Sequence, residues 1–474
     1  MTRTMRRLHL SRPVAVSRGP ARGARVSTVD GDLTFAFRTR GAWRALRACA
    51  AAATTPAMLR SIARAESGAP GVAEWASTLR TLTRYGCIAE EFTIDEAQRL
   101  RVVPQQGELR PAAPRLPART RVRLSRFAHL RRLDDHWQLD SPLGFARVEL
   151  TEAMLPLIAA LHTPQSPATL ARQHGLAPSA ARTLLATLHA HGMLTTVNAR
   201  GTASEDRDPI LRQWEFADAL FLAQHRVGRH DRDVGGKFPF WGTIAPEPAT
   251  MRFSGTRRIA LPRPHRRSVT ARDVTLVEAI ECRHSIRDYG RRAISLAQLS
   301  ELLYRSARVR GVLEANAERR YAVSSRPYPS GGGCYPLEIF VVARQCRGLA
   351  RGVYHYDAVG HALVRQRGDR DAVEALMLDA RNAQGKTSGG QVLMVFAARF
   401  RRLTWKYRSI ALATILKDVG ALLQTLYLNA TAMGLAPCGV GAGDSLRFAN
   451  AVGRSLHDVS SVGEFLVGSR PDAR

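Results

Sequence analysis

The chain has 474 residues and a formal net charge of +30, from 70 basic and 40 acidic residues. This length predicts two to four domains, and a hydrophobic fraction of 45% allows a sizeable core. No apolar run reaches the ~18 residues that a membrane span needs, so we expect no membrane partner. The six cysteines form no CxxC pair and no zinc-spaced set with histidine, which predicts free thiols in a reducing cytoplasm and no metal site.

The basic charge is carried almost entirely by arginine, since only four lysines are present. A surplus of this size needs a solvated surface, an acidic peptide partner or nucleic acid. Residues 1–25 hold seven arginines, no acidic residue and no apolar segment typical of a secretory signal. We therefore expect a disordered basic tail there, with a transit peptide as the alternative.

The clearest local pattern lies in residues 144–200. Ser166 caps a helix that has proline at its first position, and Pro178 opens a second helix. Gly192 ends this second helix, and residues 193–197 read as a short strand. The order helix, turn, helix, strand is typical of a winged helix.

A weaker echo of this pattern lies in residues 26–100, where Thr55 precedes a helix-opening proline and Gly86 precedes an apolar pair. We interpret this region as a diverged winged-helix domain and the pair of regions as a duplication. Between them, residues 101–143 are rich in arginine and proline, which predicts a basic linker or an irregular surface segment.

Residues 201–265 read as a connecting segment with one helix within 214–230. From residue 266 to 474 helices and strands are mixed. The clearest strands are Leu337–Ala343 and Val392–Ala398, and a long amphipathic helix covers Asp418–Met433. This mixture favours an α+β sandwich over a doubly wound sheet. We further expect a hairpin over 353–364 and a last strand over 464–467.

Three residues at a helix-to-loop junction, Arg283, Ser285 and Arg287, could converge on one phosphate. The planar guanidinium fork suits that anion, although a solvated basic loop is the alternative. Lys406 and Tyr407 follow a strand and an arginine-rich stretch. A desolvated lysine loses pKa and can act as a base near neutrality. The alternative is a partly buried lysine with its head in solvent.

Two glycine-rich segments could lie against a flat ligand. Ser330 precedes three glycines, Gly331 to Gly333, whose backbone N–H groups can approach a ring or a phosphate. A second segment runs from Pro437 to Asp444 and could cover the other face of a bound ring, with Cys438 as the thiol nearest to it. In both cases an ordinary turn or helix exit is the alternative.

Taken in order, these motifs resemble a known family. The run RxSxR, PSGGGxYPLE, a VYxYD hairpin, WKY and a late glycine-rich loop is similar to that of the SagB-type (SagB/ThcOx) dehydrogenases of the FMN-dependent nitroreductase-like superfamily. The resemblance covers about 214–468. It implies an α+β FMN-binding fold, a homodimer with FMN at the subunit interface, and oxidation of peptide thiazolines or (methyl)oxazolines to thiazoles or oxazoles.

The resemblance also assigns roles to residues of this chain. Arg283, Ser285 and Arg287 would bind the FMN phosphate and ribityl end, and Lys406 with Tyr407 would supply the catalytic base. The residues that would line the flavin are Pro329, Ser330, Gly331, Gly332, Cys438, Gly439 and Gly441, and Arg470 would be a further phosphate ligand.

The region 144–200 resembles the PqqD-like peptide-recognition element of such pathways, in which a precursor's leader peptide adds a strand to a small sheet. A cytoplasmic enzyme with a precursor peptide and a cyclodehydratase as partners is implied.

Two alternatives stay open. One is an NAD(P)H-dependent nitro- or quinone reductase on the same fold, because fold does not fix function. The other is a winged-helix DNA-binding regulator with a degenerate flavin domain, which the net charge would suit. The second helix of the motif, however, carries Arg182 as its only permanent cation, a poor set for phosphate and base contacts. We therefore expect no nucleic-acid partner.

Overall fold

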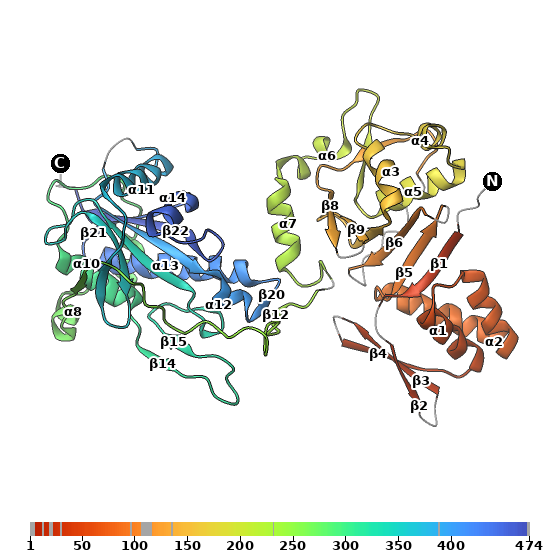
Figure 1. The fold of residues 1–474 in the computed structure, drawn as a ribbon, viewed down its shortest axis with the longest axis horizontal. Coiled ribbons are helices and arrows are strands. Elements are labelled where there is room, and N and C mark those ends of the chain that lie inside the picture. The colour runs from red at the N-terminus through yellow and green to blue at the C-terminus, as the bar shows by residue number, and fades with distance from the viewer. Residues whose placement is uncertain are drawn as a thin grey trace. The chain divides into compact units, whose positions relative to one another are not determined.

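The computed structural model describes residues 5–11, 14–18, 22–28, 31–94, 97–105, 116–133, 136–230, 232–386 and 389–471. The chain divides into two compact units, Met1–Asp233 and Val234–Arg474 (Figure 1). The division falls inside the predicted connecting segment 201–265. Its helix, α7 (Phe216–His225), belongs to the first unit.

The C-terminal unit is built on one antiparallel sheet. In sheet order its strands are β13 (Arg258–Ala260), β18 (Ala362–Arg365), β17 (Gly352–Asp357), β16 (Leu337–Ala343), β19 (Val392–Arg399), β22 (Val459–Ser469) and β21 (Leu435–Val440). Every residue of β16 and β19 is buried, so the central strands are covered on both faces. The strands and the hairpin predicted for this region are confirmed.

Helices cover both faces of this sheet (Figure 1). Because side chains alternate along a strand, Ile339 and Val341 of β16 pack on one side with α10 (Leu296–Ala307) and α13 (Ala411–Ala432). Phe340 and Val342 pack on the other side with α11 (Arg370–Ala383) and α14 (Ser445–Val452). The predicted α+β class is confirmed.

The long helix α13 positions most of the candidate site. It begins at Ala411, seven residues before the predicted start at Asp418, because the preceding run is also rich in good helix formers. Among the described residues it is the one helix long and apolar enough to cross a membrane by length and composition alone. In this unit one side of it packs against α10, β21 and β22, while Leu412 and Leu416 on another side are exposed.

Shorter elements complete this unit. They are β12 (Gly235–Gly236), α8 (Arg266–Arg272), α9 (Leu276–Cys282), β14 (Gly311–Leu313), β15 (Val323–Ser325), the 3-10 turn η3 (Gly331–Gly333), α12 (Phe400–Thr404) and β20 (Tyr407–Arg408). One prediction is wrong here: the second glycine-rich loop, 437–444, is a strand in its first half. Ala436 and Cys438 of β21 are buried in the sheet, and the interspersed proline and glycine hid their alternation in the sequence.

The N-terminal unit contains a six-stranded sheet in the order β1 (Met5–Leu10), β5 (Ile88–Thr93), β6 (Arg99–Pro104), β10 (Ala146–Leu150), β9 (His136–Asp140) and β8 (His129–Leu133). A three-stranded sheet joins β2 (Val14–Arg18), β3 (Arg22–Thr28) and β4 (Gly31–Ala36), beside the helices α1 (Arg40–Ala51) and α2 (Pro56–Arg84). Thr55 caps α2 as predicted.

The predicted order helix, turn, helix, strand is found after a 3-10 turn, η1 (Glu152–Met154), and a short helix, α3 (Leu155–Ala160). It consists of α4 (Pro167–His174), which Ser166 caps, α5 (Pro178–Ala190) and β11 (Leu194–Val197), which pairs with β7 (Arg121–Leu124). Gly86 and Gly192 both have positive φ and both link a helix to a strand. The winged-helix and duplication interpretations stay predictions.

Two further predictions for this unit are wrong. The disordered tail, 1–25, contains β1, in which Leu8 and Leu10 are buried and Arg6 pairs with Glu90. The linker, 101–143, contains three strands of the unit and the end of β6. In β1 and β7 arginines lie beside buried aliphatic side chains, Leu8, Leu10 and Val122, so the charge count masked the strands.

Candidate functional site

Lys406 lies at the centre of a buried aromatic cluster. It directly precedes β20, which pairs with β12 so that Gly236 faces Tyr407. Its Nζ donates a hydrogen bond to the hydroxyl of Tyr321. The same nitrogen lies 4.7 Å from the ring centroid of Tyr321 and 4.8 Å from that of Tyr407. Two aromatic rings therefore hold the amine between them, and Tyr321 is a partner that the sequence analysis did not identify.

The triglycine turn packs directly on this amine. Gly332 has a φ of +61°, and a Cβ at that position would overlap Lys406 Nζ and the Tyr407 hydroxyl. The Tyr321 hydroxyl donates a 2.6 Å hydrogen bond to the carbonyl of Gly332. The structure thus brings together the glycine motif and the Lys-Tyr pair, which lie more than 70 residues apart in the chain.

A buried carboxylate, Asp418, fixes the same turn from α13. It accepts a 2.5 Å hydrogen bond from Ser330 Oγ and a 3.1 Å bond from the N–H of Gly331. The Ser330 hydroxyl in turn accepts from the N–H of Tyr335. From the sequence, Asp418 was predicted only as the start of a helix. The available signal was an acidic residue on the apolar face that also carries Val419 and Leu422.

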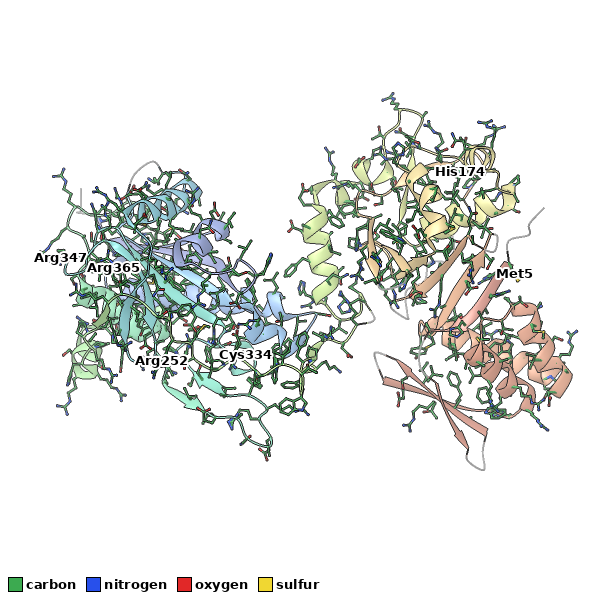
Figure 2. All side chains as sticks on the ribbon, viewed as in Figure 1. Met5, His174, Arg252, Cys334, Arg347 and Arg365 are labelled. Carbon is green, nitrogen blue, oxygen red and sulfur yellow. The ribbon has the colours of Figure 1, made fainter. Side chains whose placement is uncertain are left out.

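The Lys-Tyr pair has pKa values moved in opposite senses. Burial lowers the pKa of Lys406, and the nearby Arg402 guanidinium lowers it further, against the opposing effect of Cys334. Burial raises the pKa of Tyr407 to about 12. Burial also raises the pKa of the Cys334 thiol, labelled in Figure 2. Opposed shifts of this kind separate a base from a proton-bearing group: Lys406 can accept a proton, whereas Tyr407 keeps its own.

A second cluster forms around Tyr427 of α13. Ser285 Oγ lies 2.8 Å from the Tyr427 hydroxyl, which also accepts a 2.5 Å hydrogen bond from the N–H of Gly439. The guanidinium of Arg283 lies 5.3 Å from the centroid of the same ring. The predicted phosphate motif and the second glycine segment therefore meet, through a tyrosine that the sequence analysis did not single out.

The remaining predicted residues lie at different distances from these clusters. Arg287 and Gly441 are exposed. Cys438 is fully buried, so a molecule reaching this segment would meet Gly439 or Gly441 rather than the thiol. Arg470 donates a hydrogen bond to the carbonyl of Leu435, at the start of β21. Pro329 is exposed beside the triglycine turn.

The two clusters lie on different sides of α13 within one chain. Asp418 and Tyr427 are nine residues apart in the helix. At 3.6 residues per turn and 1.5 Å per residue, this separation is about two and a half turns and about 13 Å along the axis. One chain therefore presents the lysine cluster and the arginine cluster on opposite faces of the helix.

The residues present fit an anionic flat cofactor. Among the described residues, Arg283 and Arg287 make no ion pair with a carboxylate, which leaves both guanidiniums for a phosphate. At Gly331 a Cβ would overlap Thr414 and at Gly332 it would overlap Lys406. Glycine at both positions leaves bare backbone in the turn, which allows close approach of a ring.

Comparison with known proteins places this chain in a family. The model of the cyanobactin oxidase ThcOx matches residues 122–231, and the model of the nitroreductase family matches residues 280–467. A relative from Methanocaldococcus jannaschii, "Putative nitroreductase MJ1384", is 31% identical over 170 residues, which are 36% of this chain and 80% of the relative.

Solved structures show lower similarity. A nitroreductase-like crystal structure from Ralstonia eutropha JMP134 has 21% identity and a TM-score of 0.37, and covers 51% of this chain and 100% of its own. The microcin synthetase McbBCD complex of E. coli has 19% identity and a TM-score of 0.34, and covers 42% of this chain and 74% of its own. The family assignment rests on the sequence matches: the chain belongs to the nitroreductase family of oxidoreductases and joins its nitroreductase domain to a region similar to the cyanobactin oxidase ThcOx.

Proposed function

We propose that this protein is an FMN-dependent dehydrogenase that oxidises thiazoline or (methyl)oxazoline rings in a ribosomally made precursor peptide to thiazoles or oxazoles. The observation that carries the proposal is the Lys406 amine, whose pKa burial lowers, held against the triglycine turn beside a protonated Tyr407. A plain hydride-accepting reductase needs no such base. The ThcOx-like region in the same chain supports a peptide-ring substrate.

The reaction removes two hydrogen atoms, that is two electrons and two protons, from an azoline ring. When bound, FMN would supply the two-electron acceptor that takes hydrogen from one ring carbon as hydride. Lys406, as the neutral amine, would accept the proton from the adjacent carbon that derives from the peptide Cα. Tyr321 and Tyr407 hold the amine in place, and the bare backbone at Gly332 lets the ring approach it.

The cofactor would be held by both clusters. Arg283, Ser285 and Arg287 would hold the phosphate and ribityl end, with Gly439 nearby. The turn from Pro329 to Gly332 would line the ring. Because these groups lie on opposite faces of α13 in one chain, a binding site between two copies would bring them together, which supports a homodimer.

An exposed apolar stripe supports the same assembly. Leu412 and Leu416 of α13 are 45% and 42% exposed, and Gly420 follows one turn later on the same face. On α9, which packs against α13, Leu276, Val277 and Ile280 are each about half exposed or more. A helix face of this kind on a folded protein marks an interface, and the glycine allows the close approach of another helix.

The remaining partners follow from the proposed reaction. A precursor peptide would bind through its leader, with the small sheet of β7 and β11 as the acceptor for an added strand. A cyclodehydratase would supply the azoline rings, and the site of action would be the cytoplasm, in keeping with six cysteines that form no disulfide among the described residues, five of them buried.

The test is direct. Purified protein should bind FMN, and the loaded enzyme should convert a synthetic peptide thiazoline to the thiazole, with loss of two mass units. Rapid NAD(P)H consumption with nitroaromatics and no thiazole formation would favour a reductase, the candidate that the nitroreductase match supports. Salt-dependent binding of duplex DNA without flavin binding would favour a regulator.

A further inference from the structure

The N-terminal unit contains an apolar groove that the proposed chemistry does not use. A cavity of about 350 Å³ lies between α7 and the turns that precede and follow β8 and β9. Its apolar walls include Phe127, Leu143, Trp214 and Leu222. The volume is within the range of sites that bind small ligands or side chains, and the whole lining lies inside the ThcOx-like region, 122–231.

A second cavity extends the groove. It has a volume of about 180 Å³ and shares Leu143 and Leu211 with the first cavity, so the two adjoin. Its walls are more polar and include His189, Glu205 and Asp208. The combined groove therefore has an apolar part and a more polar part. Walls of two kinds suit a peptide with different neighbouring side chains better than a uniformly apolar molecule.

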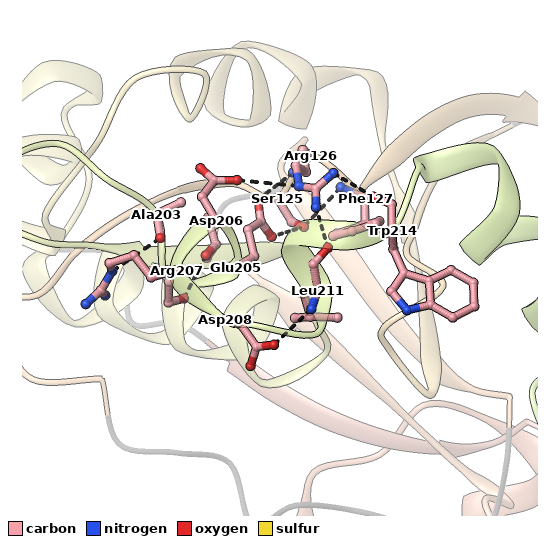
Figure 3. A network of polar contacts seen from close by, with 12 residues as sticks. Ser125, Arg126, Phe127, Ala203, Glu205, Asp206, Arg207, Asp208, Leu211 and Trp214 are labelled. Carbon is pink, nitrogen blue, oxygen red and sulfur yellow. Dashed lines mark hydrogen bonds and ion pairs between the residues drawn. The ribbon is translucent and has the colours of Figure 1, made fainter.

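A polar network fixes the walls of the groove (Figure 3). Arg126 donates to the carbonyls of Trp214, at 2.9 Å, and Leu211, at 2.5 Å. Glu205 accepts a 2.6 Å bond from Ser125 Oγ and a 2.9 Å bond from the N–H of Arg126. These bonds hold the segment before α7 against the turn after β7. A wall fixed in advance loses little conformational freedom when a ligand binds.

The two ends of the groove carry opposite charges. At the apolar end lie Arg226 and Arg229, for which the described residues supply no carboxylate partner. Arg229 is half-buried: it donates to the carbonyl of Pro142, lies 4.6 Å from the ring centroid of Phe145, and burial lowers the pKa of its guanidinium. A buried cation without a counter-charge is costly. At the other end, the carboxylates of Glu205 and Asp208 line the wall.

We propose that this groove binds an apolar-acidic segment of the precursor peptide, with a large aliphatic or aromatic side chain in the 350 Å³ cavity and a neighbouring carboxylate on Arg226 and Arg229. The acidic end of the groove then fixes the direction of the bound chain. The inference rests on the proposed peptide substrate. The 350 Å³ cavity is lined by no residue of β7 or β11, whereas the polar cavity borders β11 at Leu194 and Thr195. The groove gives the basic protein a specific contact for an acidic leader.

The experiment uses the full-length protein and three fluorescein-labelled model peptides of equal length. Each has a Gly-Ser frame around one of three centres: Leu-Leu-Glu, Leu-Leu-Gln or Ser-Ser-Glu. Fluorescence anisotropy should show that the Leu-Leu-Glu peptide binds about ten-fold or more tightly than either of the others, since both the apolar contact and the charge-assisted bond are needed. Equal affinity for all three peptides would overturn the proposal.

Three variants locate the contact. Arg226→Gln should abolish the preference for Glu over Gln, because Arg226 makes no described contact that folding requires. Leu222→Ser, at a side chain 46% exposed, should abolish the preference for Leu over Ser. The matched control is Arg212→Gln, an exposed arginine of the same segment outside the groove lining, which should change neither preference. Unchanged preferences in Arg226→Gln and Leu222→Ser would refute the site.

Two further measurements distinguish peptide binding in the groove from the proposed oxidation of azoline rings. Dodecanoate, an apolar carboxylate without a peptide chain, should displace the Leu-Leu-Glu peptide only weakly, and displacement at lower concentration than the unlabelled peptide would overturn the choice of a peptide. Peptide binding needs no flavin and no azoline. Selective peptide binding without ring oxidation would thus refute the proposed reaction and support the peptide site. Ring oxidation without selective peptide binding would support the reaction and refute the peptide site.

Discussion

The two clusters on α13 are built on opposite principles. In the lysine cluster, hydrogen bonds within the protein link the side chains to the turn: Lys406 bonds to Tyr321, Tyr321 to Gly332, and Asp418 to the serine and glycine of the turn. In the arginine cluster the backbone and hydroxyl groups are paired, but Arg283 and Arg287 have no carboxylate partner among the described residues. In the proposed mechanism the first cluster holds and moves a proton, and the second binds the phosphate of the cofactor.

Replacing the amine should cause the largest effect and test this contrast directly. We expect Lys406→Ala to keep bound FMN yet to reduce thiazole formation by about 10²–10⁴-fold, the usual contribution of a general base. Flavin absorbance after gel filtration and mass analysis of the peptide measure the two properties. Lys386→Ala is the control, because Lys386 pairs with Asp288 on the surface. A Lys406→Ala enzyme with full turnover would remove this residue from the mechanism.

Gly332→Ala should break the lysine cluster without changing any of its functional groups. The new Cβ would displace Lys406 and Tyr407, and displacement of a reacting group by about 1 Å can cost about 10²-fold in rate. Gly385→Ala is the matched control: its φ of +68° gives similar backbone strain, of about 1–2 kcal/mol, but no atom lies within 4 Å of the new Cβ. Equal losses of rate in both variants would show that strain, not the amine, is responsible.

The sequence predicted the contiguous motifs of the site better than the single residues that contact them. Contiguous motifs such as the triglycine turn and the Lys-Tyr pair were visible because glycine and lysine are unusual at those places. Tyr321, Asp418 and Tyr427 were not, because each acts through a contact across long sequence distances. Central strands such as β16 were predicted with their bounds, since an uninterrupted apolar run needs no partner to be recognised.

The edges of the fold were harder to predict than its centre. Strands β1 and β7 carry arginines beside buried aliphatic residues, so they resemble linkers by composition. Only the packed structure, in which β1 pairs with β5 and β7 with β11, shows that Leu8, Leu10 and Val122 are buried. Charge and proline content therefore reflect the exposed side chains of these strands and do not reveal the strands themselves.

Variants of the arginine cluster should have smaller effects, because two guanidiniums would bind the same phosphate. Arg283→Gln and Arg287→Gln should each weaken FMN binding by about ten-fold, the scale of one charge-assisted hydrogen bond. Fluorescence titration of the apoprotein with FMN measures the change, and riboflavin, which lacks the phosphate, should bind both variants as it binds the parent. Arg291→Gln, an exposed neighbour, serves as control. Equal weakening for riboflavin would assign the arginines to the ring and not to the phosphate.

The smallest expected effect concerns the pH dependence of the rate, which the pKa of Lys406 determines. In the proposed mechanism the neutral amine is the base, so the rate should rise as pH increases through the pKa of Lys406. Burial lowers this pKa, so the midpoint should lie below the value of about 10.4 for a free lysine. The Tyr321 hydroxyl gives its own proton to Gly332 and can only accept from Nζ. It therefore stabilises the ammonium form and leaves the lone pair of the neutral amine free.

Tyr321→Phe removes this acceptor and should have two opposite consequences. The midpoint of the pH–rate profile should move to lower pH, because the ammonium loses a hydrogen bond. The plateau rate should fall by about three- to ten-fold, because the amine is less well oriented. A purely structural role would lower the plateau and leave the midpoint unchanged. Since Tyr321 acts through Lys406, the double variant with Lys406→Ala should be no slower than Lys406→Ala alone, which distinguishes a positioning residue from an independent acid.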